Sequence, residues 1–277
     1  MDYKTILVHF DAGRTAPARL EIALQLAQQF DAHVACLYAL SAVPMPTYAA
    51  EAGTIFLEAQ ERVRTEMLQA ARAAYEACVR RSGHQKVEWR SSAADALDAV
   101  TLHGRYADLV VIGQKNEEWP SGVGKDFEQR VLFAAGRPIL AVPYAFERRP
   151  LGRNILIAWN ASREATRAVN DALPLLRRAG HVHVLACNPR RSGDAHGEVP
   201  GADIGLFLSR HGVKVTVSTQ EGSDIDVGNL LLSRAYDLSA DMIVMGAYGR
   251  SRMHEFLLGG ATRTVLQSMT VPVLMAH

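Results

Sequence analysis

Short apolar runs alternate with longer amphipathic stretches along the whole chain. The apolar runs are rich in Val, Ile and Leu, which is typical of strands that are buried on both faces. The longer stretches repeat apolar residues at helical spacing and place charged residues between them. We expect strands over 5–11, 33–38, 86–91, 108–113 and 137–142, and again over 154–160, 181–186, 213–219, 241–246 and 271–276. We expect helices over 16–29, 54–80, 93–103, 163–178, 202–211, 226–235 and from 261 onward.

This order of elements occurs twice, and the apolar runs of the two halves match one another. The run that begins at Thr5 returns at Asn154, and the run 108–113 returns as 241–246. Strands that alternate with amphipathic helices predict a parallel sheet covered on both faces. The sequence therefore predicts an α/β protein of two tandem doubly wound domains, each with a five-stranded parallel sheet and helices on both faces. We place the domains at 1–146 and 152–277, with a polar, Pro- and Gly-containing boundary between them.

Composition and charge narrow the classes of function. The 277 residues are 48% hydrophobic and carry a formal net charge of +1, which argues against a general nucleic-acid binder. No apolar run approaches the roughly 18 residues of a membrane span, and the first residues lack a signal-peptide core. Three isolated cysteines fit buried thiols rather than a disulfide framework or a zinc site. We expect a cytoplasmic protein that binds neither membrane nor nucleic acid.

The stretch 241–262 is the main candidate for chemistry. A buried strand ends at Gly246, Gly249 follows, and Gly259 and Gly260 stand directly before a helical pattern. Glycines allow the backbone to approach a ligand, and free N–H groups at a helix start favour anions. In a parallel sheet, ligands bind beyond the carboxyl ends of the strands, where the strand order reverses. A phosphate is therefore the favoured occupant, and a tight turn without a ligand is the alternative.

With these residues, both halves resemble domains of the universal stress protein family. ATP-binding members of the family carry Gly-x2-Gly-x9-Gly followed by Ser or Thr, and Gly246, Gly249 and Gly259 have that spacing. Gly260 departs from the pattern because it stands where a hydroxyl residue is usual. The resemblance implies that Gly259, Gly260 and Ala261 hold phosphates through backbone N–H groups.

The resemblance also implies where the nucleoside lies in the second half. The family usually has an Asp at the end of the first strand, and here that position is Asn160, followed closely by Ser162. The end of the second strand, at Ala186 or Cys187, would contact the adenine, and Met245 would pack on the base or ribose. Asn can both donate and accept hydrogen bonds, so contact with a nucleoside is retained in altered form. The implied ligand is ATP, with or without Mg²⁺.

The first half departs further from the family pattern. Gly113 ends its fourth strand, but Asn116 replaces the second glycine, and Lys125 and Asp126 replace the glycine pair. A carboxylate at that position would repel phosphate. Asp11 is retained at the end of the first strand. We expect a degenerate copy that does not bind ATP in the usual way.

Other candidate chemistry is weak. His181 and His183 share one face of a strand, but no third ligand is evident, so we expect no metal site. We identify no catalytic residues and no Walker lysine, so any ATP hydrolysis would be slow.

Two alternatives to a nucleotide-binding regulator stay open: a nucleotide-free scaffold, and a first half that binds another small molecule. The family resemblance further implies pairing through the last strand of each half, within one chain or between chains as a homodimer.

Overall fold

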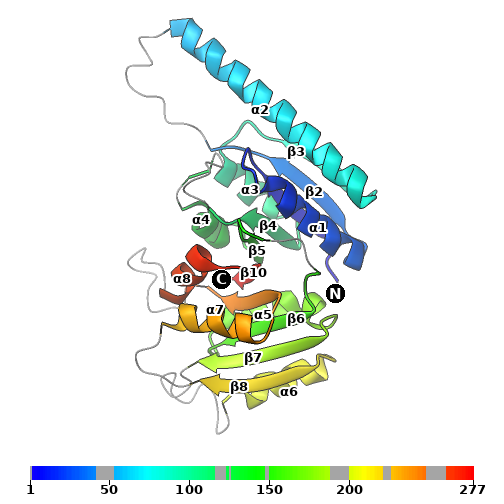
Figure 1. Cartoon of the computed structure of the whole chain (residues 1–277), viewed down its shortest axis with the longest axis vertical. Coiled ribbons are helices and arrows are strands. Elements are labelled where there is room, and N and C mark those ends of the chain that lie inside the picture. Colours follow the sequence, from blue (N-terminus) through cyan, green and yellow to red (C-terminus); the bar gives the residue numbers. More distant parts are fainter. Residues whose placement is uncertain are drawn as a thin grey trace. The chain divides into compact units, whose positions relative to one another are not determined.

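The protein is described by a computed structural model covering residues 2–41, 53–115, 123–124, 126–146, 150–187, 200–220, 226–247 and 260–277. These residues form two compact units, shown in Figure 1. One unit is Lys4–Ala135, and the other is Gly136–His277 together with Met1–Tyr3. Among the described helices, none is long and apolar enough to cross a membrane.

The unit Lys4–Ala135 contains a sheet of four parallel strands in the order β3-β2-β1-β4. The strand β1 is central, and the strand order reverses beside it, between β1 and β4. The elements, in chain order, are β1 (Thr5–Phe10), α1 (Ala16–Phe30), β2 (His33–Tyr38), α2 (Gly53–Ser82), β3 (Val87–Ser91), α3 (Ala96–Gly104), β4 (Leu109–Gly113) and α4 (Phe127–Ala134).

The second unit repeats this arrangement with parallel strands in the order β10-β9-β6-β7-β8. One further strand, β5, pairs with β10 in antiparallel orientation. The elements are β5 (Ile139–Val142), β6 (Asn154–Trp159), α5 (Arg163–Leu176), β7 (His181–Cys187), α6 (Ala202–Arg210), β8 (Val215–Gln220), α7 (Val227–Asp237), β9 (Met242–Gly246), α8 (Gly260–Ser268) and β10 (Val273–Ala276).

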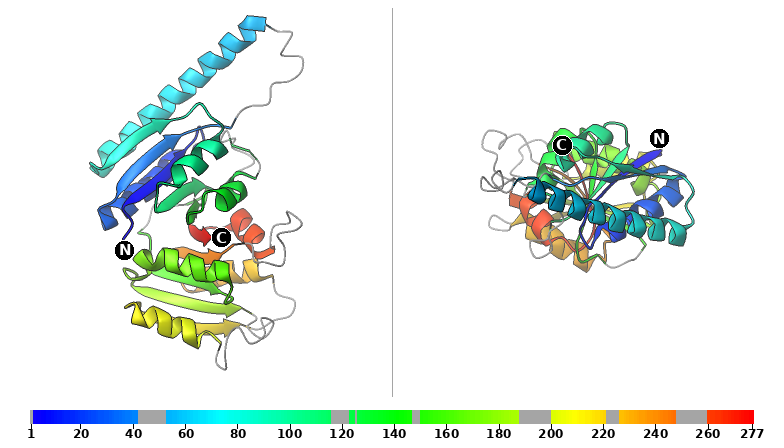
Figure 2. Two further views of the ribbon diagram at one scale, coloured as in Figure 1. Left: turned by 180° about the vertical axis from the view of Figure 1, so that it is seen from behind. Right: turned by 90° about the horizontal axis from the view of Figure 1, so that it is seen from above.

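Helices cover both faces of each sheet, as Figures 1 and 2 show. In the first unit, α1 and α2 pack together, and α3 packs with α4. In the second unit, α5 and α6 lie on one face, and α7 and α8 pack against each other on the opposite face. The central strands are buried on both sides, and Val110, Val111 and Val244 are fully inaccessible to solvent. This burial explains why these strands are continuously apolar rather than alternating.

The predicted fold class is confirmed, and the structure adds one feature of the last strands. The strand β10 is hydrogen-bonded along both edges, to β9 on one side and to β5 on the other. The two last strands therefore pair within one chain, and an apolar strand edge is covered. Pairing between chains stays a prediction.

Candidate functional site

The second unit has its point of strand-order reversal between β6 and β9. The two strands run parallel in neighbouring positions, with Ala158 opposite Met245. The chain leaves β6 for α5 on one face and leaves β9 for the side that carries α8. Residues that follow the two strands therefore emerge at the same edge of the sheet, where open α/β sheets bind ligands.

The turn from β6 into α5 is held by two side chains. Asn160 Oδ1 accepts a hydrogen bond from the Ser162 backbone N–H at 3.1 Å, and Ala161 between them is left-handed with φ of 54°. Ser162 Oγ then accepts from the Ala165 backbone N–H at 3.1 Å, which caps the helix start. The two predicted site residues Asn160 and Ser162 thus lie together at the strand end, and Asn160 is exposed.

Gly246 has a packing role that the sequence analysis did not anticipate. A Cβ placed on it would lie 2.4 Å from the Ala165 backbone nitrogen and 2.6 Å from the Glu164 carbonyl carbon. Real Cβ atoms do not approach backbone this closely, so only glycine lets the start of α5 rest on the end of β9. The predicted approach of ligand to Gly246 is untested, and close helix packing already requires this glycine.

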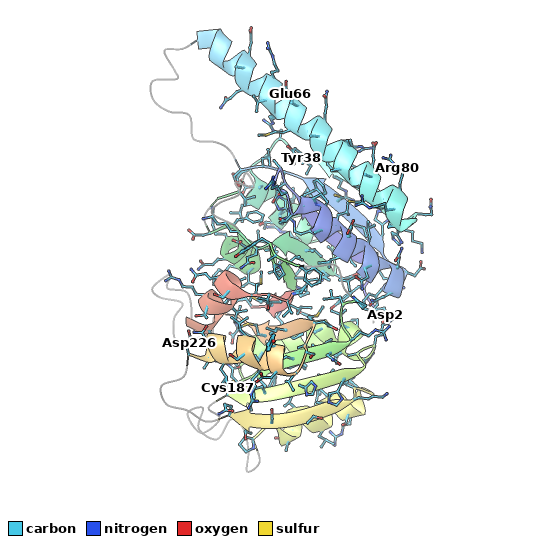
Figure 3. The ribbon with its side chains drawn as sticks, viewed as in Figure 1. Asp2, Tyr38, Glu66, Arg80, Cys187 and Asp226 are labelled. Carbon is cyan, nitrogen blue, oxygen red and sulfur yellow. The ribbon has the colours of Figure 1, made fainter. Side chains whose placement is uncertain are left out.

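Of two further predicted residues, Met245 is buried and Cys187 is half-buried. Met245 is 4% exposed at the end of β9. Cys187 ends β7, as Figure 3 shows, and burial raises the pKa of its thiol to about 11. At neutral pH this thiol is protonated, which argues against a role as a nucleophile. Only backbone or packing contacts to a ligand suit these positions.

The start of α8 is exposed among the described residues. Gly260 is its first residue and is exposed, and a Cβ placed on it would meet no described atom within 4 Å. Ala261 is half-buried, and Thr262 is buried. Packing among the described residues does not demand glycine at 260, in contrast to 246. Gly249 and Gly259, the other two predicted glycines, lie outside the described residues.

An acidic residue at the start of α7 braces this region, and the sequence analysis missed it. Asp226 Oδ2 accepts from Thr264 Oγ1 in α8 at 3.0 Å, and Oδ1 accepts from the Gly228 backbone N–H at 2.8 Å. A Cβ on Gly228 would lie 2.5 Å from the Thr264 Cβ, so the two helices pack closely here. Figure 3 shows Asp226 at the beginning of α7. An N-cap aspartate was a possible signal, but its partner in α8 could not be inferred from local sequence.

Comparison with known proteins identifies the family. The Universal stress protein family matches the chain twice, over residues 2–143 and 152–277. This chain belongs to the universal stress protein family. No curated protein matches the chain.

Solved structures show the same fold along the whole chain. A universal stress protein from Archaeoglobus fulgidus DSM 4304 is 17% identical with a TM-score of 0.64, covering 98% of this chain and 95% of its own. A functionally unknown protein from Pseudomonas aeruginosa PAO1 is 16% identical with a TM-score of 0.60, covering 99% and 92%. A putative universal stress protein from Pseudomonas aeruginosa UCBPP-PA14 is 16% identical with a TM-score of 0.58, covering 99% and 93%. At these identities the likeness concerns the fold alone.

In the first universal stress protein domain, buried side chains of the protein lie against the ends of β1 and β4, which correspond to the ends of β6 and β9 in the second domain. Asp11 follows β1, and its Oδ2 forms an ion pair with Arg19 Nη2 at 2.8 Å, with both residues almost completely buried. A Cβ placed on Gly113, at the end of β4, would lie only 2.0 Å from Arg19 Nη1. The guanidinium therefore lies against the end of β4. In the second domain, the backbone of Glu164 and Ala165 itself lies against the end of β9.

The start of α4, which corresponds to the start of α8, is also occupied by protein. Glu128 Oε1 accepts a hydrogen bond from the Lys115 backbone N–H at 2.5 Å, just beyond β4. Burial raises the pKa of Glu128, and hydrogen bonds from its own backbone and from Lys115 act in the opposite direction. A carboxylate of the protein thus lies at the start of α4, a position that favours anions. The sequence analysis singled out Asp126, which is exposed, but did not single out Glu128 or Arg19.

The histidine pair on β7 shows no metal-site geometry. His181 and His183 have ring centroids 4.3 Å apart, and His181 Nε2 lies 2.9 Å from Thr216 Oγ1. Burial and then His181 lower the pKa of His183. Across the part of the chain that the structure describes, no group of three or more His, Cys, Asp or Glu could hold a metal ion. The two histidine rings contact each other, and His181 also lies within hydrogen-bonding distance of Thr216 on the neighbouring strand.

Proposed function

We propose that the chain is a stress-response regulator whose second domain binds ATP or a related adenine nucleotide. The observation that carries the proposal is the contrast between two equivalent helix starts in one chain. At α4, Glu128 supplies a carboxylate from the protein, whereas Gly260 at α8 is exposed and a Cβ placed on it would meet none of the described atoms within 4 Å. An open helix N-terminus beside a strand-order reversal favours an anionic ligand from outside.

The proposed contacts follow the elements that meet at this edge. Backbone N–H groups of Gly259, Gly260 and Ala261 hold phosphates. Asn160 and Ser162 contact the nucleoside, and the end of β7 at Cys187 contacts the adenine. Met245 and Gly246 border the site, and Gly249 belongs to the glycine motif that follows them in the sequence. We propose no catalytic residue, so bound ATP acts as a signal and turns over slowly if at all.

Substitution of Gly260 tests the phosphate contact. Gly260→Ser introduces the hydroxyl that is usual in the family, and we expect ATP affinity to rise by roughly three- to tenfold through one added hydrogen bond. Gly260→Glu places a carboxylate at the helix start, and we expect affinity to fall more than about tenfold through charge repulsion. Isothermal titration calorimetry with ATP measures both changes.

The matched control is Gly124→Glu in the first domain. A Cβ on Gly124 also meets no described atom within 4 Å, and this glycine lies shortly before α4. We expect this variant to bind ATP as the parent protein does. If the parent protein releases no adenine nucleotide on denaturation, and added ATP does not raise its melting temperature, the proposal is wrong.

A further inference from the structure

The two domains build the same turn after their first strand, from different side chains. Asp11 Oδ1 accepts from the Gly13 backbone N–H at 2.8 Å, and Asn160 Oδ1 accepts from the Ser162 backbone N–H at 3.1 Å. The turn needs an acceptor, so it uses an oxygen in both cases. This leaves the second atom of each side chain for other partners.

The second atoms have opposite hydrogen-bonding character. Asp11 Oδ2 is an acceptor, and it takes the Arg19 guanidinium at 2.8 Å. The corresponding atom of Asn160 is the amide nitrogen Nδ2, which can only donate. Asn160 is exposed, and no described residue accepts a hydrogen bond from its Nδ2. The strand end of the second domain therefore presents a donor where the first domain presents an acceptor.

The charged groups next to Asn160 favour an acceptor with negative charge. Arg163 begins α5 just beyond the turn, and its side chain is 64% exposed. Glu164 follows it, but its carboxylate is 3% exposed and its Oε1 lies 3.6 Å from Arg163 Nη2. The accessible groups at this helix start are thus the amide donor, a guanidinium and the positive end of the helix dipole.

We propose that Asn160 selects adenine nucleotides that carry a phosphate at the 2′ or 3′ position of the ribose over those whose 2′,3′-diol is free. This inference rests on the proposed nucleotide site. A free diol donates two O–H groups, for which a carboxylate is the natural partner. A phosphate at the 2′ or 3′ position replaces one of these donors with negatively charged acceptor oxygens, which suit the Asn160 amide and Arg163, and which a carboxylate at 160 would repel.

The decisive experiment compares two ligands that differ only at the ribose. Calorimetry with AMP and with adenosine 3′,5′-bisphosphate gives the ratio of affinities for the parent protein and for Asn160→Asp. We expect the parent to bind the bisphosphate about tenfold or more tightly than AMP, since the added contacts are charge-assisted. We expect Asn160→Asp to bind AMP more tightly than the bisphosphate.

Two further variants keep the result interpretable. Asn170→Asp makes the same charge change farther along α5, where Asn170 is exposed, and it should leave the ratio of the parent protein unchanged. Asn160→Ser keeps an oxygen for the turn and can both donate and accept, so its ratio should lie between those of the parent and Asn160→Asp. It serves as the test variant if Asn160→Asp does not fold.

The possible failures are separable. If the parent and Asn160→Asp both bind AMP with an unchanged ratio, or if the parent prefers AMP, the selectivity inference is overturned and the nucleotide site stands. If no variant binds AMP, the bisphosphate or ATP, both the nucleotide site and the selectivity inference are overturned.

Discussion

Arg19→Met is expected to lower the free energy of unfolding of the first domain by about 3–5 kcal/mol. The substitution keeps the volume of a long side chain but leaves the buried Asp11 carboxylate without its cation. Arg19 also donates from Nε to the His9 carbonyl at 3.2 Å, and this hydrogen bond is lost as well. Urea unfolding followed by circular dichroism measures the change.

The double variant Arg19→Met with Asp11→Asn isolates the electrostatic part of that cost. The amide oxygen introduced by Asp11→Asn can still accept from the Gly13 backbone N–H, as the Asp11 carboxylate does now, while the buried charge disappears. Because a neutral pair of similar volume avoids an unpaired buried ion, we expect the double variant to be more stable than Arg19→Met alone. Equal stability of the two variants would contradict the buried ion pair as the cause.

Acidification from pH 7.5 to pH 4 is expected to remove about 3 kcal/mol of stability through His9. His9 is buried in the first domain, and burial lowers its pKa from 6.5 to about 4. This pKa is the net result of several causes: burial is the largest and the Arg19 charge acts in the same direction, whereas Asp11 and the hydrogen bond to the Ala39 carbonyl act against them. Between pH 6.5 and pH 4 the unfolded chain binds a proton at this residue that the folded chain does not. The free energy of unfolding therefore rises with pH across this window and levels off above it.

The variant His9→Gln provides the control for the pH dependence. Gln retains an amide donor that can reach the Ala39 carbonyl, to which His9 Nε2 lies at 2.9 Å, but it does not titrate. The slope of unfolding free energy against pH between 4 and 6.5 should decrease by about one proton. An unchanged slope would show that other groups cause the acid sensitivity.

The elements of the fold could be predicted from local patterns because each depends on periodicity along the chain. Apolar runs such as Leu109–Gly113 and Met242–Gly246 lie where the sequence placed them. The long helix is Gly53–Ser82 rather than 54–80, and the strand expected from 213 begins at Val215. Such shifts at element ends depend on caps and side-chain contacts that periodicity does not contain.

The candidate site was harder to predict from the sequence than the fold, and four residues show why. Arg19 lies in an amphipathic helix, where a charged residue is normally expected on the wet face, yet it is 2% exposed because Asp11 pairs with it. Asp226 and Thr264 are far apart in sequence and meet only through the packing of α7 on α8. Gly246 was read as a point of ligand approach, and its contact with α5 required coordinates.

The sequence by itself determined the duplicated α/β architecture, the membership of both halves in one family, and the difference between their glycine loops. Those properties depend on residue order and spacing, which are local. The tertiary structure decided which side chains lie at the strand ends and helix starts of each domain, and whether they are buried or exposed. In the first domain, Arg19 and Glu128 place charge where a ligand would lie, whereas in the second Asn160 and Gly260 are exposed. Burial of a charge depends on which distant partner folds against it, and no spacing along the chain encodes that distance.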